Sequence, residues 1–279
     1  MRRNPLATYL INDQPSHNLE LVVSYPQWLD EILRCPQTGE RLQRDGHAYV
    51  RADGKAYPVV NGVLSIVYPE VLGAQDATMN KLYRWLAPLY DLNERIAGRL
   101  LVGVDMVAGR RRIVELLGLR PGMRLLEVSP GPGVFQPFLR HDLHEEGRIV
   151  ALDLSMPMLR QCQVRNSRIE VHLVHGNASY LPFADESFDA LFHFGGVNLF
   201  SEPEKALAEF VRVVRRDGLV SYGDEGFGKA YPDTVRRRIL AKINPGFVKP
   251  RPMAPNGISD IKEHEVYGGL GYLVVGGKV

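Results

Sequence analysis

Two carboxylates and two glycines lie in one stretch of the sequence at a spacing suited to binding a nucleotide. Glu127 closes a short apolar run, Gly131 and Gly133 follow it, and Asp153 closes the next apolar run. Glycine has no Cβ, so the backbone at both positions can approach a bulky ligand closely. A carboxylate placed like Asp153 can accept hydrogen bonds from a ribose diol. Glu127 would attract a ligand ammonium group and repel a pyrophosphate.

These residues require a strand, a turn, a helix and a second strand to bring them together. The apolar residues before Glu127 and those at 149–152 predict two buried strands, and the residues between them predict a helix. Such a unit makes the two strands parallel and places their carboxyl ends at one edge of a sheet. Strand–helix alternation continues to residue 225, and residues 261–276 predict a hairpin. We therefore expect an α/β fold with a mostly parallel sheet and a reversed last strand.

The composition is that of an ordinary globular protein with room for one α/β domain and a smaller module. The chain has 279 residues and a formal net charge of +2, which neither requires nor excludes nucleic acid. We interpret Arg110–Arg112 and Arg236–Arg238 as solvated faces of helices. Cys35 and Cys162 are too few for a disulfide framework. No apolar segment follows Met1 and none reaches about eighteen residues, so a cytoplasmic protein without a membrane span is expected.

Four stretches beyond residue 110 carry a recognisable pattern. They are Leu126-Glu-Val-Ser-Pro-Gly-Pro-Gly133, Ala151-Leu-Asp-Leu-Ser-x-x-Met158, Gly176-Asn-Ala-x-x-Leu-Pro-Phe-x-Asp-x-Ser-Phe-Asp189 and Glu204-Lys-Ala-Leu-x-Glu-x-x-Arg-Val-Val-x-x-x-Gly218. Together they resemble a class I S-adenosylmethionine-dependent methyltransferase of the small-molecule or quinone-biosynthesis type, over about three-fifths of the chain. The third stretch is the most specific, because its order and spacing rarely recur by chance.

The resemblance implies a Rossmann-like seven-stranded sheet, S-adenosyl-L-methionine as cofactor, S-adenosyl-L-homocysteine as product and a small-molecule acceptor. Glu127 and the Gly131 backbone would hold the methionine end, and Asp153 the ribose hydroxyls. Leu154 would pack on the adenine, whose edge the Asn177 side chain and the Ala178 amide would read, while Phe194 and Gly195 would lie near the sulfonium. The predicted cofactor site therefore consists of Glu127, Ser129, Gly131, Gly133, Asp153, Leu154, Asn177, Ala178, Phe194 and Gly195.

The sequence departs from the family pattern in the cofactor site. Ser129 stands where the family has the first glycine of its loop, and Pro130 and Pro132 stiffen that loop. Asn177 stands where the family usually has aspartate, although its amide oxygen can still accept a hydrogen bond from the adenine amino group. These departures leave cofactor binding more secure than turnover.

Methyl transfer needs a base only if the acceptor must lose a proton early. Candidates are His193, Tyr222 and Asp224, at or near the carboxyl ends of the fourth and fifth strands of the domain. His193 fits equally well as a hydrogen-bonded strand histidine. Two alternatives stay open: a non-catalytic S-adenosylmethionine-binding or scaffold protein, and a fold relative that catalyses a non-methylating reaction. Nucleic acid is disfavoured as a partner, because the catalytic Cys and the Asn/Asp-Pro-Pro-Tyr signature of base-modifying enzymes are missing.

The sequence divides into three regions: an arm and β module over 1–72, a helical lid over 73–108 and the methyltransferase-like domain over 109–279. In the module, Asp53-Gly54 and Asn61-Gly62 separate β-prone runs, which is a strong hairpin signal. Cys35-Pro36 and residues 57–63 resemble the zinc-ribbon-like modules found beside methyltransferase domains, but too few thiolates remain for a four-ligand zinc site, so no metal is expected. The module could act as a lid or contact a second copy or a protein partner.

The lid region contributes two further predictions. Residues 76–108 are interpreted as a helix that precedes the sheet and partly covers the active site, with apolar residues at helical spacing. Tyr83 and Tyr90 on this segment are expected, as part of a group of aromatic residues, to face the substrate, although core packing is the better explanation of each of them taken alone.

Overall fold

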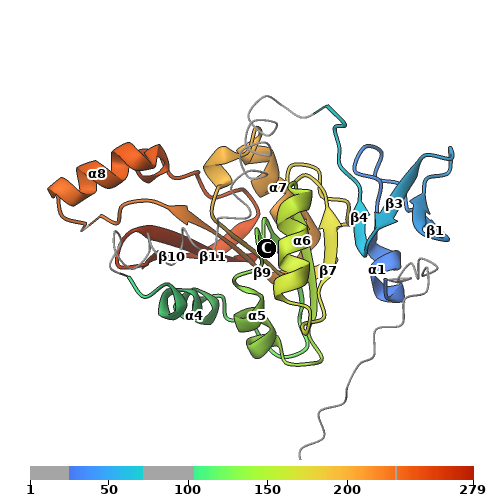
Figure 1. Ribbon diagram of the computed structural model, residues 1–279, viewed down its shortest axis with the longest axis horizontal. Coiled ribbons are helices and arrows are strands. Elements are labelled where there is room, and N and C mark those ends of the chain that lie inside the picture. Colours follow the sequence, from blue (N-terminus) through green and yellow to red (C-terminus); the bar gives the residue numbers. More distant parts are fainter. Residues whose placement is uncertain (1–24, 72–103, 230) are drawn as a thin grey trace, which may run out of the picture.

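The computed structural model describes residues 25–71, 104–229 and 231–279, and its strands form one mixed sheet (Figure 1). The expected lid residues Tyr83 and Tyr90 lie outside the described residues. The strands are β1 (Gln43–Asp45), β2 (Ala48–Val50), β3 (Ala56–Val60), β4 (Val63–Ser65), β5 (Arg124–Val128), β6 (Arg148–Asp153), β7 (His172–His175), β8 (Phe188–Phe194), β9 (Val214–Glu225), β10 (Ile258–Val266) and β11 (Gly271–Lys278). The helices are α1 (Gln27–Ile32), α4 (Met106–Leu116), α5 (Gln136–Leu143), α6 (Met156–Arg165), α7 (Pro203–Val213) and α8 (Val235–Ile243), with 3-10 turns η3 (Val197–Leu199) and η4 (Pro245–Val248).

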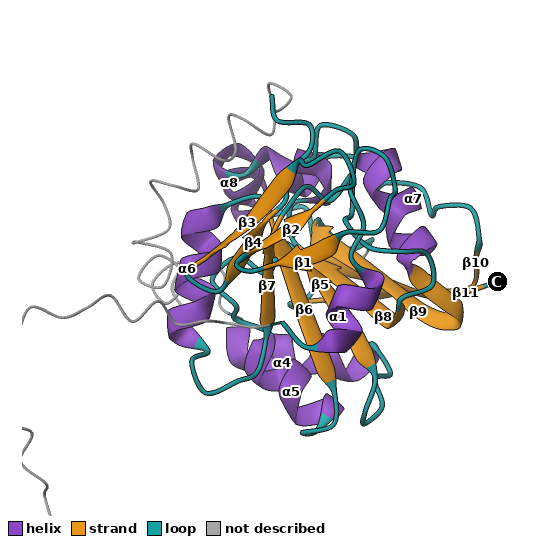
Figure 2. Ribbon diagram, turned by 90° about the vertical axis from the view of Figure 1, so that its right-hand side faces the viewer, coloured by secondary structure: helices purple, strands orange, loops and turns teal. Residues whose placement is uncertain are grey.

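Helices cover both faces of the sheet, as a mostly parallel sheet requires (Figure 2). The apolar sides of α4 and α5 pack with Leu125 and Ile149 in one core cluster. On the opposite face, α1 and α7 pack with Leu126 and Val150. Because the central strands are buried on both faces, their sequences are continuous apolar runs. The α/β class predicted from those runs is confirmed.

The sheet has eleven strands rather than the seven implied by the resemblance, in the order β1-β2-β3-β4-β7-β6-β5-β8-β9-β11-β10. The four extra strands belong to the N-terminal module, because β4 pairs in parallel with β7. This pairing covers the backbone groups that β7 would otherwise expose as an edge strand. The Asn61-Gly62 hairpin was recognisable from the sequence, but the partner of β4 lies more than a hundred residues away and leaves no local signal.

The C-terminal hairpin is present, with β11 antiparallel to both β10 and β9. The reversed strand is the last in the chain, but it lies one position inside the sheet because β10 takes the edge. The helix expected from residue 110 begins earlier, since Asp105 caps it by accepting hydrogen bonds from the Val107 and Ala108 amides. Arg110 on this helix is buried, contrary to its interpretation as solvated. No helix among the described residues is long and apolar enough to cross a membrane.

Tyr25 fastens the N-terminal module to the rest of the sheet. Its buried hydroxyl accepts a hydrogen bond from the Leu64 amide of β4 at 2.8 Å and lies 2.6 Å from the Leu173 carbonyl oxygen of β7. The neighbouring Trp28 stacks against the guanidinium groups of Arg124 and Arg148, at the starts of β5 and β6. The module is therefore bound to the sheet by polar and aromatic contacts as well as by strand pairing.

Replacing Tyr25 with phenylalanine should lower the free energy of unfolding by about 1–3 kcal/mol, because two buried backbone groups lose their partner. Urea denaturation followed by circular dichroism measures this loss. Tyr180→Phe is the control, since the ring contacts of Tyr180 with Tyr68 and Lys205 survive the change. Equal stability of the Tyr25→Phe variant and the unaltered protein would contradict the fastening role.

Candidate functional site

Glu127 and Asp153 lie next to each other at the carboxyl ends of the neighbouring parallel strands β5 and β6. Both side chains are buried, with exposed fractions of 2% and 8%. Burial, together with the charge of Asp153, raises the pKa of Glu127 to about 8, and burial raises the pKa of Asp153 to about 6. Neither carboxylate forms an ion pair within the described part of the chain. Two desolvated carboxyl groups side by side favour a ligand that carries positive charge and hydroxyl donors.

Each backbone amide of the loop after β5 donates a hydrogen bond to another group of the protein. The Ser129 amide donates to the Leu152 carbonyl at 2.7 Å, and the Gly133 amide to the Pro130 carbonyl at 3.0 Å. The Gly131 amide donates to the Asp153 carboxylate at 3.0 Å. The two prolines of the loop have no N–H. Since no amide of residues 129–133 is left over, this loop does not form the cluster of N–H donors that binds a pyrophosphate.

The loop glycines serve different purposes. Gly131 has a φ of +54° and nothing within 4 Å of the position a Cβ would take, so its outer side is open. At Gly133, with a φ of +76°, a Cβ would meet Asn166 Nδ2 at 2.3 Å and Cys162 Sγ at 2.5 Å. Gly133 is thus required for packing against α6, whereas Gly131 lies on the ligand side. Ser129 has a φ of +56°, which is strained for a residue with a side chain, so the substitution changes the residue without changing the turn.

Gln136 is a site residue that the sequence analysis missed. It is the first residue of α5, is fully buried, and donates from Nε2 to the Glu127 carboxylate. Its Oε1 has no hydrogen-bond partner among the described residues. A polar residue three positions after Gly133, in the first turn of the following helix, was the available signal. The oxygen of Gln136 adds a second acceptor close to the Glu127 carboxylate.

A hydrogen-bond relay connects the N-terminal module to the loop after Asp153. The Leu154 carbonyl accepts from Nε2 of His175 at 3.1 Å, which fixes the tautomer of that ring. Nδ1 of His175 then accepts from the Ser65 hydroxyl of β4 at 3.0 Å. Burial lowers the pKa of His175, so the neutral ring that this relay needs is favoured. The sequence analysis did not identify His175 as a candidate site residue.

Asn177 and Ala178 follow β7 and are both buried. The Asn177 side-chain oxygen accepts from the Ser179 amide at 3.0 Å, which closes a tight turn. The oxygen expected to face the adenine therefore already accepts one backbone hydrogen bond and keeps a second lone pair. Leu154 is half-buried at the neighbouring strand end.

Phe194 and Gly195 lie at the end of β8, beside β5. The ring of Phe194 packs between Phe135 and Tyr267, with centroid distances of 5.8 and 5.7 Å. Gly195 has a φ of +94° and open space beyond its Cα. These residues make an apolar wall that continues from the glycine loop to the edge of the sheet.

The three candidate bases are enclosed by the protein. His193 is fully buried against Phe200 and Phe210, and its Nδ1 donates to the Val128 carbonyl at 3.0 Å. Burial lowers its pKa and keeps the ring neutral. The Tyr222 side chain is also fully buried.

Asp224 holds the loop after β8. Its carboxylate accepts from the Gly196 amide at 2.9 Å, the Asn198 amide at 3.2 Å and the Glu225 amide at 2.8 Å. This carboxylate thus fixes the backbone next to Gly195, while the base role predicted for the three residues stays a prediction.

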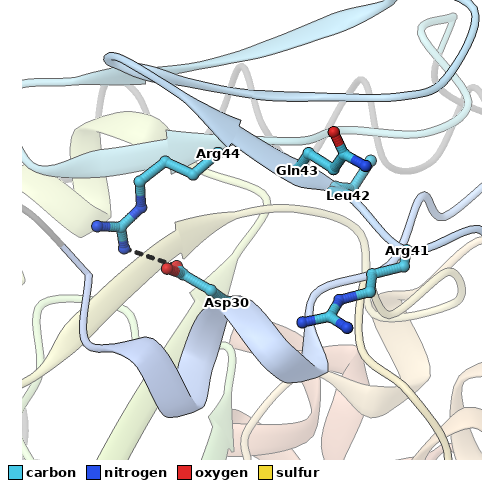
Figure 3. Close-up of a pocket in the computed structure, with 5 residues that line it drawn as sticks. All are labelled: Asp30, Arg41, Leu42, Gln43 and Arg44. Carbon is cyan, nitrogen blue, oxygen red and sulfur yellow. Dashed lines mark hydrogen bonds and ion pairs between the residues drawn. The ribbon is translucent and has the colours of Figure 1, made fainter.

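A pocket in the N-terminal module lies far from these residues. It is formed between α1 and β1 at the opposite end of the sheet and is lined by Asp30, Arg41, Leu42, Gln43 and Arg44 (Figure 3). Arg44 pairs with Asp30 at 2.6 Å across it. In the same module, Cys35 lies 3.2 Å from the Tyr57 hydroxyl. No group of three metal-ligating side chains is found among the described residues, so the zinc-ribbon resemblance stays a prediction.

The parallel central strands with helices on both faces define a Rossmann-like α/β fold. Residues 126–222 match the family model described as "Methyltransferase domain", so the chain contains a methyltransferase domain. It is 37% identical to the demethylmenaquinone methyltransferase of Renibacterium salmoninarum over 166 residues, which cover 57% of this chain and 66% of that protein. It is also 37% identical to a phthiotriol/phenolphthiotriol dimycocerosates methyltransferase of Mycobacterium ulcerans, over 37% of this chain and 38% of that protein.

Solved structures share the fold. One of them is phosphoethanolamine N-methyltransferase 2 of Haemonchus contortus in complex with S-adenosyl-L-methionine, with a TM-score of 0.55 and 14% identity. The alignment covers 76% of this chain and 61% of that chain. The chain thus spans less than two thirds of the length of these relatives, and the likeness establishes a methyltransferase fold rather than a substrate.

The raised pKa of Glu127 predicts how stability depends on pH. An unfolded glutamate titrates near about 4.3, so between that value and about 8 the folded protein binds more protons through Glu127 than the unfolded chain does. Its contribution to stability is therefore present at low pH and is lost as the pH rises toward 8. In the unaltered protein, Glu127 should make the free energy of unfolding fall by as much as about 1.4 kcal/mol per pH unit within this range. Glu127→Gln should remove this pH dependence, because glutamine does not titrate. Urea titrations of both proteins at several pH values measure the difference, and parallel profiles would contradict the buried state of Glu127.

Proposed function

We propose that the chain binds S-adenosyl-L-methionine and transfers its methyl group to a lipophilic small-molecule acceptor. The observation that carries the proposal is the pair of buried carboxyl groups, Glu127 and Asp153, beside a loop without free amides. A dinucleotide would place its pyrophosphate against that loop and against Glu127, where it finds repulsion and no donors. A nucleoside with a cationic amino-acid tail meets an acceptor at each end.

The residues present fit such a cofactor. Glu127 would accept from the ammonium group, and the unpartnered Gln136 Oε1 would add a second acceptor there. Asp153 would accept from the ribose hydroxyls, and the open side of Gly131 would let the backbone approach. Phe194 and Gly195 would border the transferred group. When bound, the cofactor supplies a methyl group activated by a sulfonium.

The chain's own contribution to the reaction would be positioning and the exclusion of water. Asp224 supports this role, because its hydrogen bonds from the Gly196 and Asn198 amides hold the loop after β8 beside the apolar wall. We propose Asp224 as a positioning residue. The full burial of His193 and Tyr222 favours a structural role for both of these residues as well.

Two observations support a lipophilic acceptor. The wall formed by Phe135, Phe194 and Tyr267 is aromatic and offers little to a charged molecule. Two relatives with 37% identity are named for a demethylated menaquinone and for phthiotriol dimycocerosates, and the present chain would accept a molecule of similar apolar character. The alternative is a protein that binds the cofactor without catalysing methyl transfer. Ser129 favours this alternative, because it replaces a glycine of the family's loop at a strained φ.

Calorimetric titration with S-adenosyl-L-methionine and S-adenosyl-L-homocysteine tests the cofactor site. Gly131→Ala should weaken binding of both at least about tenfold, because a methyl group would fill the space next to the two carboxylates, and strain at a positive φ should cost about 1 kcal/mol of stability. Gly46→Ala is a matched control, since Gly46 has the same φ of +54° and equally open surroundings in the distant β1–β2 turn.

The control variant should lose similar stability and keep its affinity. No binding of either ligand to the unaltered protein would refute the proposed function. Binding without methylation of any quinol or lipid acceptor would favour the non-catalytic alternative.

The Ser65–His175 relay predicts that the N-terminal module contributes to cofactor affinity. Ser65→Ala should raise the dissociation constant for S-adenosyl-L-methionine about three- to tenfold, because the His175 ring that donates to the Leu154 carbonyl loses the hydroxyl that orients it. Ser65→Thr keeps the hydroxyl and should restore most of the affinity. Ser187→Ala removes a buried hydroxyl that donates only to the Ala184 carbonyl, so it should leave affinity unchanged. If Ser65→Ala and the unaltered protein bind the cofactor with equal affinity, the N-terminal module does not contribute to cofactor affinity through this relay.

A further inference from the structure

Helix α8 presents an apolar stripe to solvent. Val235, Ile239 and Ile243 recur every fourth residue and are 72%, 49% and 64% exposed. The opposite side of the helix faces the protein: Leu240 is buried, and Arg237 donates to the Tyr231 carbonyl and stacks on Phe227 at 4.6 Å. The helix is therefore amphipathic, but unlike an ordinary surface helix it exposes most of its apolar residues to solvent.

Basic residues flank this stripe on both sides. At 100° per residue, Arg236 lies along one border of the stripe and Arg238 and Lys242 along the other, and all three are exposed. Arg238 forms an ion pair with Asp233 at 3.4 Å, but both side chains are 70% exposed. Such an exposed pair is weak, so Arg238 can exchange Asp233 for another anion. Residues 235–251 contain six arginines and lysines and no acidic residue.

The apolar surface continues beyond α8 toward the candidate site. Val248, on η4, is 60% exposed, and Met253 is 89% exposed. Lys249 donates to the Asn198 carbonyl at 3.2 Å, in the loop held by Asp224. Phe247 stacks on Phe227, just beyond the end of β9. Helix α8 thus projects from the molecule (Figure 1), and Lys249, which ends η4, connects this segment to the loop after β8.

We propose that α8 and η4 lie on an anionic phospholipid bilayer, with Val235, Ile239 and Ile243 inserted among the acyl chains and Arg236, Arg238 and Lys242 in the headgroup layer. An apolar stripe bordered by cations matches the interface of such a membrane. A second copy of the chain fits this surface poorly, because it would bring Arg236, Arg238 and Lys242 against the same three positive charges.

This association does not depend on the proposed methyl transfer, although a lipophilic acceptor would then reach the aromatic wall from the bilayer. The occupant is identified by its charge and its apolar interior, so vesicles with and without an anionic lipid are the direct probe. The catalytic and cofactor-binding residues are not part of this surface.

Co-sedimentation of the full chain with phosphatidylcholine vesicles, with and without phosphatidylglycerol, tests the proposal. The protein should bind only the vesicles that contain phosphatidylglycerol, and added salt should release most of it. Replacing Arg236, Arg238 and Lys242 together with glutamine should lower the partition coefficient about a hundredfold, since each cation near an anionic surface contributes about fivefold. Ile239→Gln with Ile243→Gln should weaken binding by a similar factor.

Matched controls lie on α6 and in the turn after it, away from the proposed surface. One control replaces Arg160, Arg165 and Arg168 with glutamine, which removes as many positive charges as the triple change on α8. A second control, Val164→Gln, removes an exposed apolar side chain. These variants should bind vesicles as the unaltered protein does. Calorimetric titration of the α8 variants with S-adenosyl-L-methionine should show unchanged affinity, which separates a failure of this surface from a failure of the cofactor site.

Two results would overturn the proposal. Vesicle binding that is equally strong for the α8 variants and the unaltered protein would place the membrane contact elsewhere. A protein that ignores every vesicle, but binds an acidic polypeptide such as polyglutamate through Arg236, Arg238 and Lys242, would make this surface a protein-binding site.

Discussion

Burial of two neighbouring carboxyl groups is the constraint on which the site depends. Glu127 and Asp153 lie at adjacent strand ends because β5 and β6 are parallel and in register, and the packed helices remove water from both. Desolvation opposes ionisation of each group, and the proximity of the two opposes it further. Such an arrangement persists only with compensating donors. The amides of Gly131 and Ser155 supply them for Asp153, and Gln136 supplies one for Glu127.

The glycine loop follows from the same constraint. Its turn must bring the Gly131 amide to the Asp153 carboxylate, which needs positive φ at residues 129, 131 and 133. Glycine meets this need without strain at two of the three positions, and serine accepts it at the third. The prolines between them remove amides that an anion would otherwise attract. The turn thus has positive φ at three positions although only two of them are glycine, and its prolines offer no N–H to an anion.

Local patterns predicted much of the domain and few of the contacts that join its parts. The apolar runs ending at Glu127 and Asp153 are visible because those strands are buried on both faces, and the Asn61-Gly62 turn is visible because its backbone requires those residues. The pairing of β4 with β7 and the Ser65–His175–Leu154 relay depend on partners more than twenty residues apart, so no periodicity reveals them. Gln136 was missed because a polar residue in a first helical turn is normally solvated.

The position of His193 shows that the face toward which a strand residue points must be considered as well as its place at the end of the strand. Its place in β8 predicts a side chain close to the ligand edge, but strand side chains alternate between faces. His193 points to the face covered by α7, whereas Phe194, one residue later, points to the face of Phe135 and the glycine loop. Because side chains alternate along β8, Phe194 lies on the side of the glycine loop, and His193 lies in the core on the opposite side. A site built in this way relies on enclosure and alignment, and it suits an acceptor whose recognition is mainly apolar.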